Sequence, residues 1–126
     1  MNPYPDIFSI RNQKEFEKIT LKVFRHQFDN NKVYQDFCLL LKKDKSNVKS
    51  LDEIPFLPIQ FFKSHEIVGS TNPIQETFTS SGTTGNSTSK HLVTDITLYE
   101  QSFRDAFSQF YGNIEDYVIL ALLPSY

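Results

Sequence analysis

The sequence predicts an α/β fold with an incomplete sheet, and three observations lead to this prediction. Apolar residues recur at three- and four-residue intervals in three separate stretches, as on the buried side of amphipathic helices. Short segments near the middle of the chain look like strands. Residues 117–123 are apolar without alternation, which is the pattern of a strand buried on both faces of a mainly parallel sheet.

The composition is that of a globular protein. The chain has 126 residues, of which 39% are hydrophobic and 14% aromatic, which is enough to bury a core and too much for a disordered chain. Thirteen basic and fifteen acidic residues give a net charge of −2, so the composition creates no general attraction to nucleic acid or to an anionic membrane. We expect neither of them to be a partner.

The cysteine content and the length of the apolar runs indicate where in the cell the protein is located. Cys38 is the single cysteine, which excludes an intrachain disulfide and a zinc site built from several thiolates. The first residues lack the basic and apolar regions of a secretory signal. The longest apolar run, 118–123, is far shorter than the ~20 residues that span a bilayer. We therefore expect a soluble cytoplasmic protein without a membrane span.

The first 50 residues are expected to form a helical lead-in, an antiparallel pair of helices. Asn12 and Glu15 have the spacing of a capping box, so a first helix should begin there. Its apolar side consists of Phe16, Ile19, Val23, Phe24 and Phe28. After the turn-forming stretch 29–31, the apolar side of a second helix consists of Val33, Tyr34, Phe37, Leu40 and Leu41.

The next elements are shorter. Pro55 and Pro58 interrupt residues 51–63, so we expect a packed connector there with one helical turn at 58–64. Short strands are expected at residues 66–68, 75–79 and 90–94. Thr97 and Glu100 form a second capping box, which predicts a helix that ends at Gly112.

The apolar strand expected at residues 117–123 needs a neighbour on each side. Only three other segments look like strands, and all of them are short. We therefore expect the chain to be an N-terminal fragment, with residues 51–126 as the first part of a larger α/β domain. Apolar surface left open by such a truncation would favour dimerisation.

The sharpest signal is the loop at residues 79–90, which is rich in hydroxyl side chains and ends in a lysine. Gly82 and Gly85 allow the backbone to turn and to approach a ligand closely. Backbone amides and hydroxyls donate to phosphate oxygens, and Lys90 adds a positive charge. No carboxylate lies within the loop to repel an anion. This composition favours a phosphate-binding loop.

Two common nucleotide-binding motifs do not fit this loop. The P-loop needs a glycine directly before its lysine, and neither Gly82 nor Gly85 precedes Lys90 in that way. The Gly-x-Gly-x-x-Gly fingerprint of dinucleotide-binding proteins is also absent. A flexible, solvated hairpin remains the alternative, since the same residues are typical of turns.

The loop resembles the phosphate-binding signature of adenylate-forming enzymes, Thr-Ser-Gly-Thr-Thr-Gly-x-Pro-Lys. The matching residues are Ser80, Ser81, Gly82, Thr83, Thr84 and Gly85. Lys90 follows five residues after the last glycine instead of three, and the proline is missing, so the equivalence of Lys90 to the family lysine is open. This departure is similar to the acyl-protein synthetase (LuxE-type) branch. Residues 54–65, the helix from Thr97 and residues 120–126 also resemble that branch.

The resemblance implies part of a ligase and acyltransferase. The full-length protein would use ATP and Mg²⁺ to convert a carboxylic acid, such as a fatty acid, to an acyl-adenylate and pass the acyl group to a protein or thiol acceptor. The residues that bind the nucleotide phosphates would be Ser80, Ser81, Gly82, Thr83, Thr84, Gly85 and Lys90. The acceptor cysteine and the adenine- and metal-binding segments of the family would lie beyond Tyr126. We therefore expect residues 1–126 to be inactive alone.

A rival hypothesis is a non-enzymatic interaction module whose loop is merely flexible. No histidine, cysteine or acidic residue has the spacing of a metal site, so no metal ligand is predicted. His65 and His91 flank elements that the resemblance places near the substrate region, but we expect both to serve ordinary packing. Cys38 lies in an apolar run, and nothing near it in sequence argues for a lowered thiol pKa.

Overall fold

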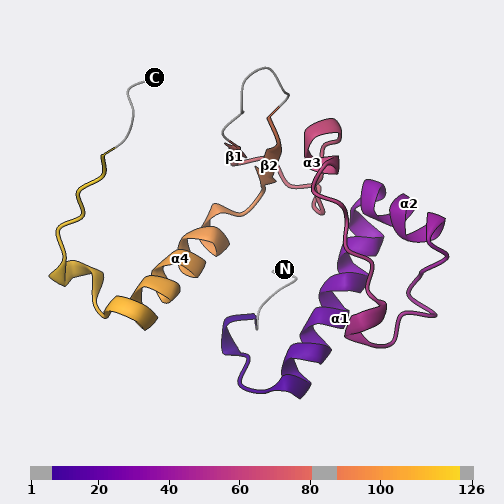
Figure 1. Cartoon of the computed structure of the whole chain (residues 1–126), viewed down its shortest axis with the longest axis horizontal. Helices are drawn as coiled ribbons and strands as arrows, with labels where there is room; N and C mark the ends of the chain where they lie inside the picture. The colour runs from indigo at the N-terminus through magenta and orange to yellow at the C-terminus, as the bar shows by residue number, and fades with distance from the viewer. Residues whose placement is uncertain (1–6, 81–87, 123–126) are drawn as a thin grey trace. The chain divides into compact units, whose positions relative to one another are not determined.

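The computed structural model describes residues 7–80 and 88–122 (Figure 1). Its elements in chain order are η1 (Ile7–Ser9), α1 (Gln13–Asn30), α2 (Lys32–Leu40), η2 (Leu51–Glu53), α3 (Phe61–Ser64), β1 (Glu76–Thr79), β2 (Lys90–Val93), α4 (Ile96–Tyr111) and η3 (Ile114–Asp116). The chain divides into two compact units, Met1–Thr94 and Asp95–Tyr126. Helices combined with a two-stranded antiparallel sheet are compatible with the predicted α/β class. The predicted boundary between residues 50 and 51 stays a prediction.

The first helix begins where its capping residues predict. The side chain of Asn12 accepts a hydrogen bond from the backbone amide of Glu15 at 3.0 Å. The Glu15 carboxylate reaches back and accepts from the amide of Arg11 at 2.8 Å. The first bond satisfies an amide that a helix N-terminus leaves without an intrahelical partner, and the second ties the preceding residue to the first turn. The predicted start of α1 is confirmed.

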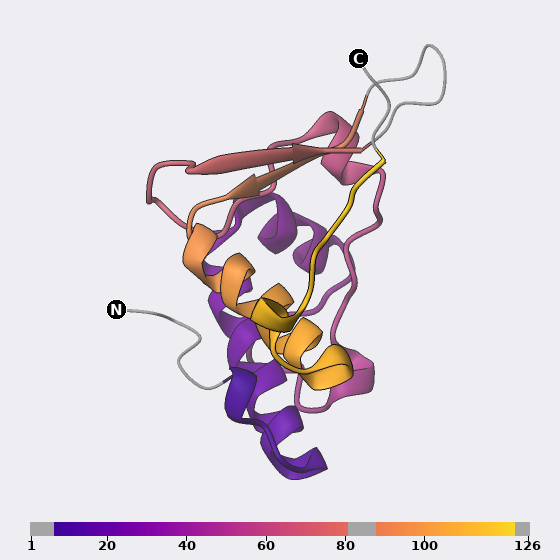
Figure 2. The same cartoon turned by 90° about the vertical axis from the view of Figure 1, so that its left-hand side faces the viewer.

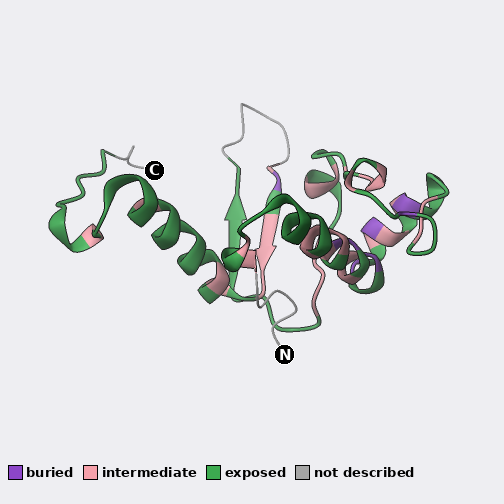
Figure 3. Ribbon diagram, turned by 90° about the horizontal axis from the view of Figure 1, so that it is seen from below, coloured by how far each residue is buried: buried purple, intermediate pink, exposed green. Residues whose placement is uncertain are grey.

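The core of the first unit joins α1, α2 and the segment that follows them (Figure 3). It consists of Phe24, Phe28, Tyr34, Cys38 and Val48. The ring of Phe24 packs against those of Phe28 and Tyr34, with centroids 6.1 and 6.2 Å apart. The Tyr34 hydroxyl donates to the carbonyl of Pro55 at 2.7 Å. The helical pair is thereby tied to the proline-containing connector, as the apolar pattern of residues 51–63 predicts.

The buried side of α2 differs from the prediction. Leu40 and Leu41 were expected on it, but they are 82% and 52% exposed, whereas Cys38 is fully buried. Leu40 is the last residue of α2 and lies about 120° around the helix from the buried Tyr34. Leu41 follows the helix, and the chain reverses at Lys42, which has a left-handed φ of 56°. The amide of Lys43 donates to the carbonyl of Cys38 and that of Lys42 to the carbonyl of Leu39, both at 2.9 Å, which is the Schellman arrangement of a helix end.

A short helix and a hairpin of two strands follow. The amide of Phe61 donates to the Pro58 carbonyl at 3.0 Å, which confirms the helical turn predicted at residues 58–64. Strands β1 and β2 confirm two of the three short strands predicted in this region, and α3 lies beside them (Figure 2). The strand predicted at residues 66–68 is wrong, because the structure has no regular element there.

The second unit consists of α4, η3 and an extended tail. Its helix starts two residues earlier than the capping box at Thr97 predicted, because Asp95 is the actual N-cap. The carboxylate of Asp95 accepts from the Thr97 hydroxyl and from the amides of Thr97 and Leu98, and these hydrogen bonds lower its pKa. The helix ends at Gly112, whose φ of 87° suits a residue without a Cβ. The predicted stop is confirmed.

The buried strand predicted at residues 117–123 is wrong for the part that the structure describes. Residues 117–122 follow η3 as an extended tail that contains no strand. Val118, Leu120 and Leu122 are 89%, 88% and 101% exposed. An apolar run forms a buried strand only where neighbouring strands receive its backbone hydrogen bonds, and the described part of the second unit contains no strand that could do so.

No helix in the described part of the chain is both long and apolar enough to cross a membrane.

The environment of Cys38 leads to a first prediction. Burial raises the pKa of its thiol, although a hydrogen bond with Tyr34 partly offsets this effect, and burial also raises the pKa of Tyr34. A group whose pKa is higher in the folded state stabilises the fold below the pKa of the unfolded chain, and this contribution is lost as the pH rises further. Stability is therefore expected to fall above about pH 8.5, the ordinary pKa of a thiol, by at most about 1.4 kcal/mol per pH unit for each such group.

Urea unfolding followed at about pH 7.5 and about pH 9 measures this effect, since a thiol in the unfolded chain is mostly ionised at the higher pH while most tyrosines are not. The variant Cys38→Ala removes the thiol and should flatten the dependence. An equal fall in stability for the wild-type protein and the variant would contradict the assignment to Cys38.

Candidate functional site

The structure describes two of the seven residues predicted to bind phosphate. Ser80 follows β1 directly, and Lys90 is the first residue of β2. Ser81, Gly82, Thr83, Thr84 and Gly85 lie outside the described residues. The site is therefore built from the two strands and from the residues at the ends of the loop.

Hydrogen bonds close the two ends of the loop against each other. The amide of Ser80 donates to the carbonyl of Ser89 at 3.1 Å. The amide of Ser89 donates back to the Ser80 hydroxyl oxygen, also at 3.1 Å. Ser89 is only 5% exposed. A hydroxyl that accepts one bond still has its own proton to donate, so Ser80 remains chemically able to bind an anion.

The strand register determines which face of the hairpin carries the lysine. Lys90 lies opposite Thr79, and His91 lies opposite Phe78. Directly opposite residues in an antiparallel pair share a face, and successive residues alternate between faces. Lys90 and Thr79 therefore share one face, and the side chains of His91 and Phe78 share the other.

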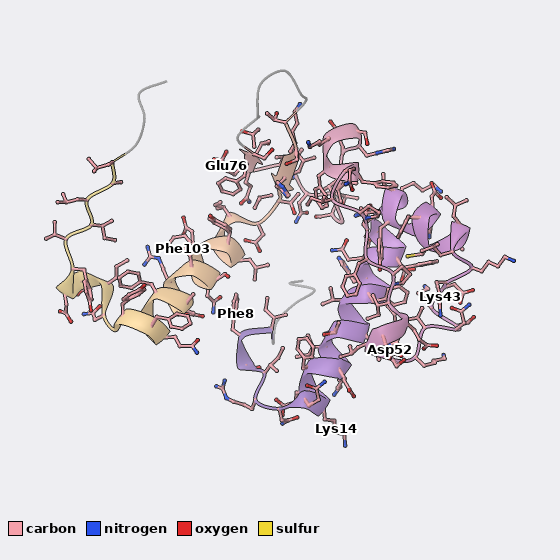
Figure 4. The ribbon with its side chains drawn as sticks, viewed as in Figure 1. Phe8, Lys14, Lys43, Asp52, Glu76 and Phe103 are labelled. Carbon is pink, nitrogen blue, oxygen red and sulfur yellow. The ribbon has the colours of Figure 1, made fainter. Side chains whose placement is uncertain are left out.

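The face of Lys90 suits an anion. Lys90 is exposed, and none of the salt bridges in the described part of the chain involves it. Glu76 is the one acidic residue on the two strands, and it lies opposite Val93 at the other end of the pair (Figure 4). The register puts Glu76 on the face of His91. A phosphate beside Lys90 would therefore meet no carboxylate from either strand.

The other face of the hairpin is connected to α3 by an aromatic stack. The ring of Phe62 lies 4.8 Å from the imidazole of His91, with an angle of 25° between the planes. The preceding residue, Phe61, packs against Phe37 of α2 at 5.7 Å and stacks on His65 at 5.1 Å. The prediction that His65 and His91 serve packing is confirmed.

Other reactive groups lie apart from the hairpin. Within the described ranges, no three histidine, cysteine or acidic side chains come together as a metal site. Cys38 is fully buried among the helices of the first unit, so its thiol is not exposed for acyl transfer. The described residues of the candidate site are therefore Ser80, Ser89 and Lys90.

Sequence reasoning missed two residues of this arrangement. Ser89 was one hydroxyl among many in the loop, and only its pairing with Ser80 distinguishes it. Phe62 belonged to an apolar connector, and its contact with His91 joins residues 29 positions apart. A serine at each end of a hairpin loop is a signal that could have identified Ser89.

Comparisons with known proteins agree on one family. Residues 3–109 match the sequence profile described as "Acyl-protein synthetase, LuxE". A long-chain-fatty-acid–luciferin-component ligase of Photorhabdus luminescens is 36% identical over 74 residues, which are 58% of this chain and 63% of that protein. The ligase of the same name from Aliivibrio fischeri is 30% identical over 93 residues, 72% of this chain and 24% of that protein. The chain thus spans less than two thirds of either relative. No solved structure matches it.

Proposed function

Because the chain belongs to the acyl-protein synthetase (LuxE) family, we propose that it forms the N-terminal part of a ligase that activates a long-chain fatty acid with ATP. The activated acyl group passes to a protein or thiol acceptor. Support for the substrate comes from the relatives, both of which are named long-chain-fatty-acid ligases. Support for the phosphate site comes from the hairpin. Lys90 is exposed on one face, and the hydrogen bonds between Ser80 and Ser89 join the two ends of the loop beside it.

The proposed role of the hairpin follows from the charge that develops in adenylation. The fatty acid carboxylate attacks the α-phosphorus of ATP, and pyrophosphate leaves with additional negative charge. Positioned amides, hydroxyls and a cation stabilise such a leaving group without reorganising during the reaction. We assign this role to Ser80, Ser81, Gly82, Thr83, Thr84, Gly85 and Lys90.

Magnesium enters the proposal only as the ion that accompanies ATP. At such sites it is bound mainly by the phosphates, by water and by one or two carboxylates. The described residues contain no cluster of three or more candidate metal ligands. No step is therefore assigned to a metal held by this chain. The acyl acceptor is likewise not assigned here, since Cys38 is buried.

ATP–pyrophosphate exchange in the full-length protein tests this function. Exchange should depend on an added long-chain fatty acid, because pyrophosphate is released only after carboxylate attack. Residues 1–126 alone should show none, since they supply one part of the nucleotide site. A full-length protein that is folded but catalyses no exchange with any fatty acid would refute the proposed activity, and exchange by residues 1–126 alone would refute the proposed division.

A further inference from the structure

The short helix α3 makes aromatic contacts in two directions. Phe61 contacts Phe37 of α2, and Phe62 contacts His91 of β2. Neighbouring residues on a helix do not face the same way, so one turn of helix can bind two different elements. Both rings are half-buried in the structure. The helix therefore connects the helical part of the first unit to the hairpin.

The contact with His91 lies directly beside the candidate site. His91 follows Lys90 in the strand and points to the opposite face. The stacked geometry, with centroids 4.8 Å apart and planes 25° apart, is within the range of favourable aromatic pairs. A ring held against His91 from one face thus restrains the backbone that carries Lys90 on the other.

The hairpin itself is a very small sheet. The two strands are four residues each and form a sheet of two strands, which is marginally stable by itself. All four residues of β1 are exposed, whereas three of the four in β2 are partly buried. Besides its partner strand β1, β2 contacts the short helix α3. We therefore expect the contact with α3 to help fix the position of β2.

We propose that Phe62 is a positioning residue for the phosphate site. By stacking on His91, it holds Lys90 and the paired residues Ser80 and Ser89 in place. The proposal rests on the function proposed above, because it needs the hairpin to bind the departing pyrophosphate. Phe62 does not touch the nucleotide in this account. Its effect should appear in the chemical step, where Lys90 meets the developing charge.

Matched variants of the full-length protein test this role. Phe62→Leu keeps an apolar side chain and loses the ring, so kcat for pyrophosphate exchange should fall about 2- to 10-fold with a smaller change in KM for ATP. Phe62→Tyr keeps the ring and should restore kcat. Phe61→Leu removes the neighbouring ring of the same helix and should leave kcat within about twofold.

The partner variants test whether the effect passes through His91. His91→Phe keeps an aromatic ring and should retain kcat, whereas His91→Ala should lower kcat by about the same factor as Phe62→Leu. The double variant Phe62→Leu/His91→Ala should be no slower than the slower single variant, because both remove the same contact. Losses that simply multiply would overturn the proposal.

A spectroscopic measurement separates the contact from its consequence. The Phe62 ring should shift the proton resonances of the His91 imidazole in residues 1–126, and Phe62→Leu should remove this shift while Phe61→Leu does not. If the shift is lost but kcat is unchanged, the contact exists and the positioning role is refuted. A wild-type protein without any exchange would instead refute the proposed function.

Discussion

Replacing Gly82 or Gly85 by valine in the full-length protein is expected to slow ATP–pyrophosphate exchange about a hundredfold or more. A glycine lets backbone amides approach phosphate oxygens closely, and a branched Cβ at the same place prevents that approach. Each hydrogen bond to a charged group contributes roughly 1.5 to 3 kcal/mol, so losing two of them corresponds to about two to four orders of magnitude in rate.

The matched control for these variants is another glycine outside the loop. A Cβ at Gly69 would meet the end of the Gln27 side chain at 2.6 Å, and this flexible amide is able to move aside. Gly69→Ala should therefore leave exchange unchanged. Rates equal to wild type in both Gly82→Val and Gly85→Val would refute the phosphate-loop assignment and leave the fold description intact.

Lys90→Ala is expected to slow the same exchange reaction about tenfold to a hundredfold, because it removes a charged contact of roughly 1.5 to 3 kcal/mol. Lys90 is exposed and forms none of the described salt bridges, so its loss should change folding little. Thermal unfolding of the variant verifies this point.

Two further variants show whether a slower reaction results from the loss of the positive charge at position 90. Lys22→Ala removes an exposed lysine of α1 and should leave the exchange rate unchanged. Lys90→Arg keeps the positive charge and should recover part of the rate. If Lys90→Ala retains the wild-type rate, the longer spacing between Gly85 and Lys90 has put the lysine out of reach, and another cation must assist the leaving group.

Helices were predictable where local chemistry determines them. The side-chain oxygen of Asn12 and the missing Cβ of Gly112 act within a few residues, so the start of α1 and the end of α4 could be predicted from sequence. The helix α4 starts earlier than predicted because Asp95, which accepts three hydrogen bonds, takes the capping position instead of Thr97.

Features that depend on distant residues were predicted less well. The segment 117–122 has the apolar run of a buried strand, but the described part of its unit contains no strand to pair with it. Leu40 and Leu41 are apolar and near the helical period of α2, but both are exposed. In both cases an apolar residue is buried only where another element packs against it, and a local pattern does not specify that element.

The sequence predicts phosphate-binding chemistry for Ser80 and Lys90, because hydroxyls and a lysine near glycines suit it, and this stays a prediction. The contacts around these two residues could not be predicted. The bonds between Ser80 and Ser89 depend on the strand register, and the stack of Phe62 on His91 depends on where α3 packs against β2.

The central claim is that the loop at residues 80–90 binds the phosphates of ATP. Amide hydrogen exchange of the full-length protein, measured with and without ATP, tests it most directly. ATP should slow the exchange of amides in residues 80–90, while those of α1 stay unchanged. Equal exchange of the loop amides in both states, at ATP concentrations that saturate the protein, would contradict the claim and favour a merely flexible hairpin.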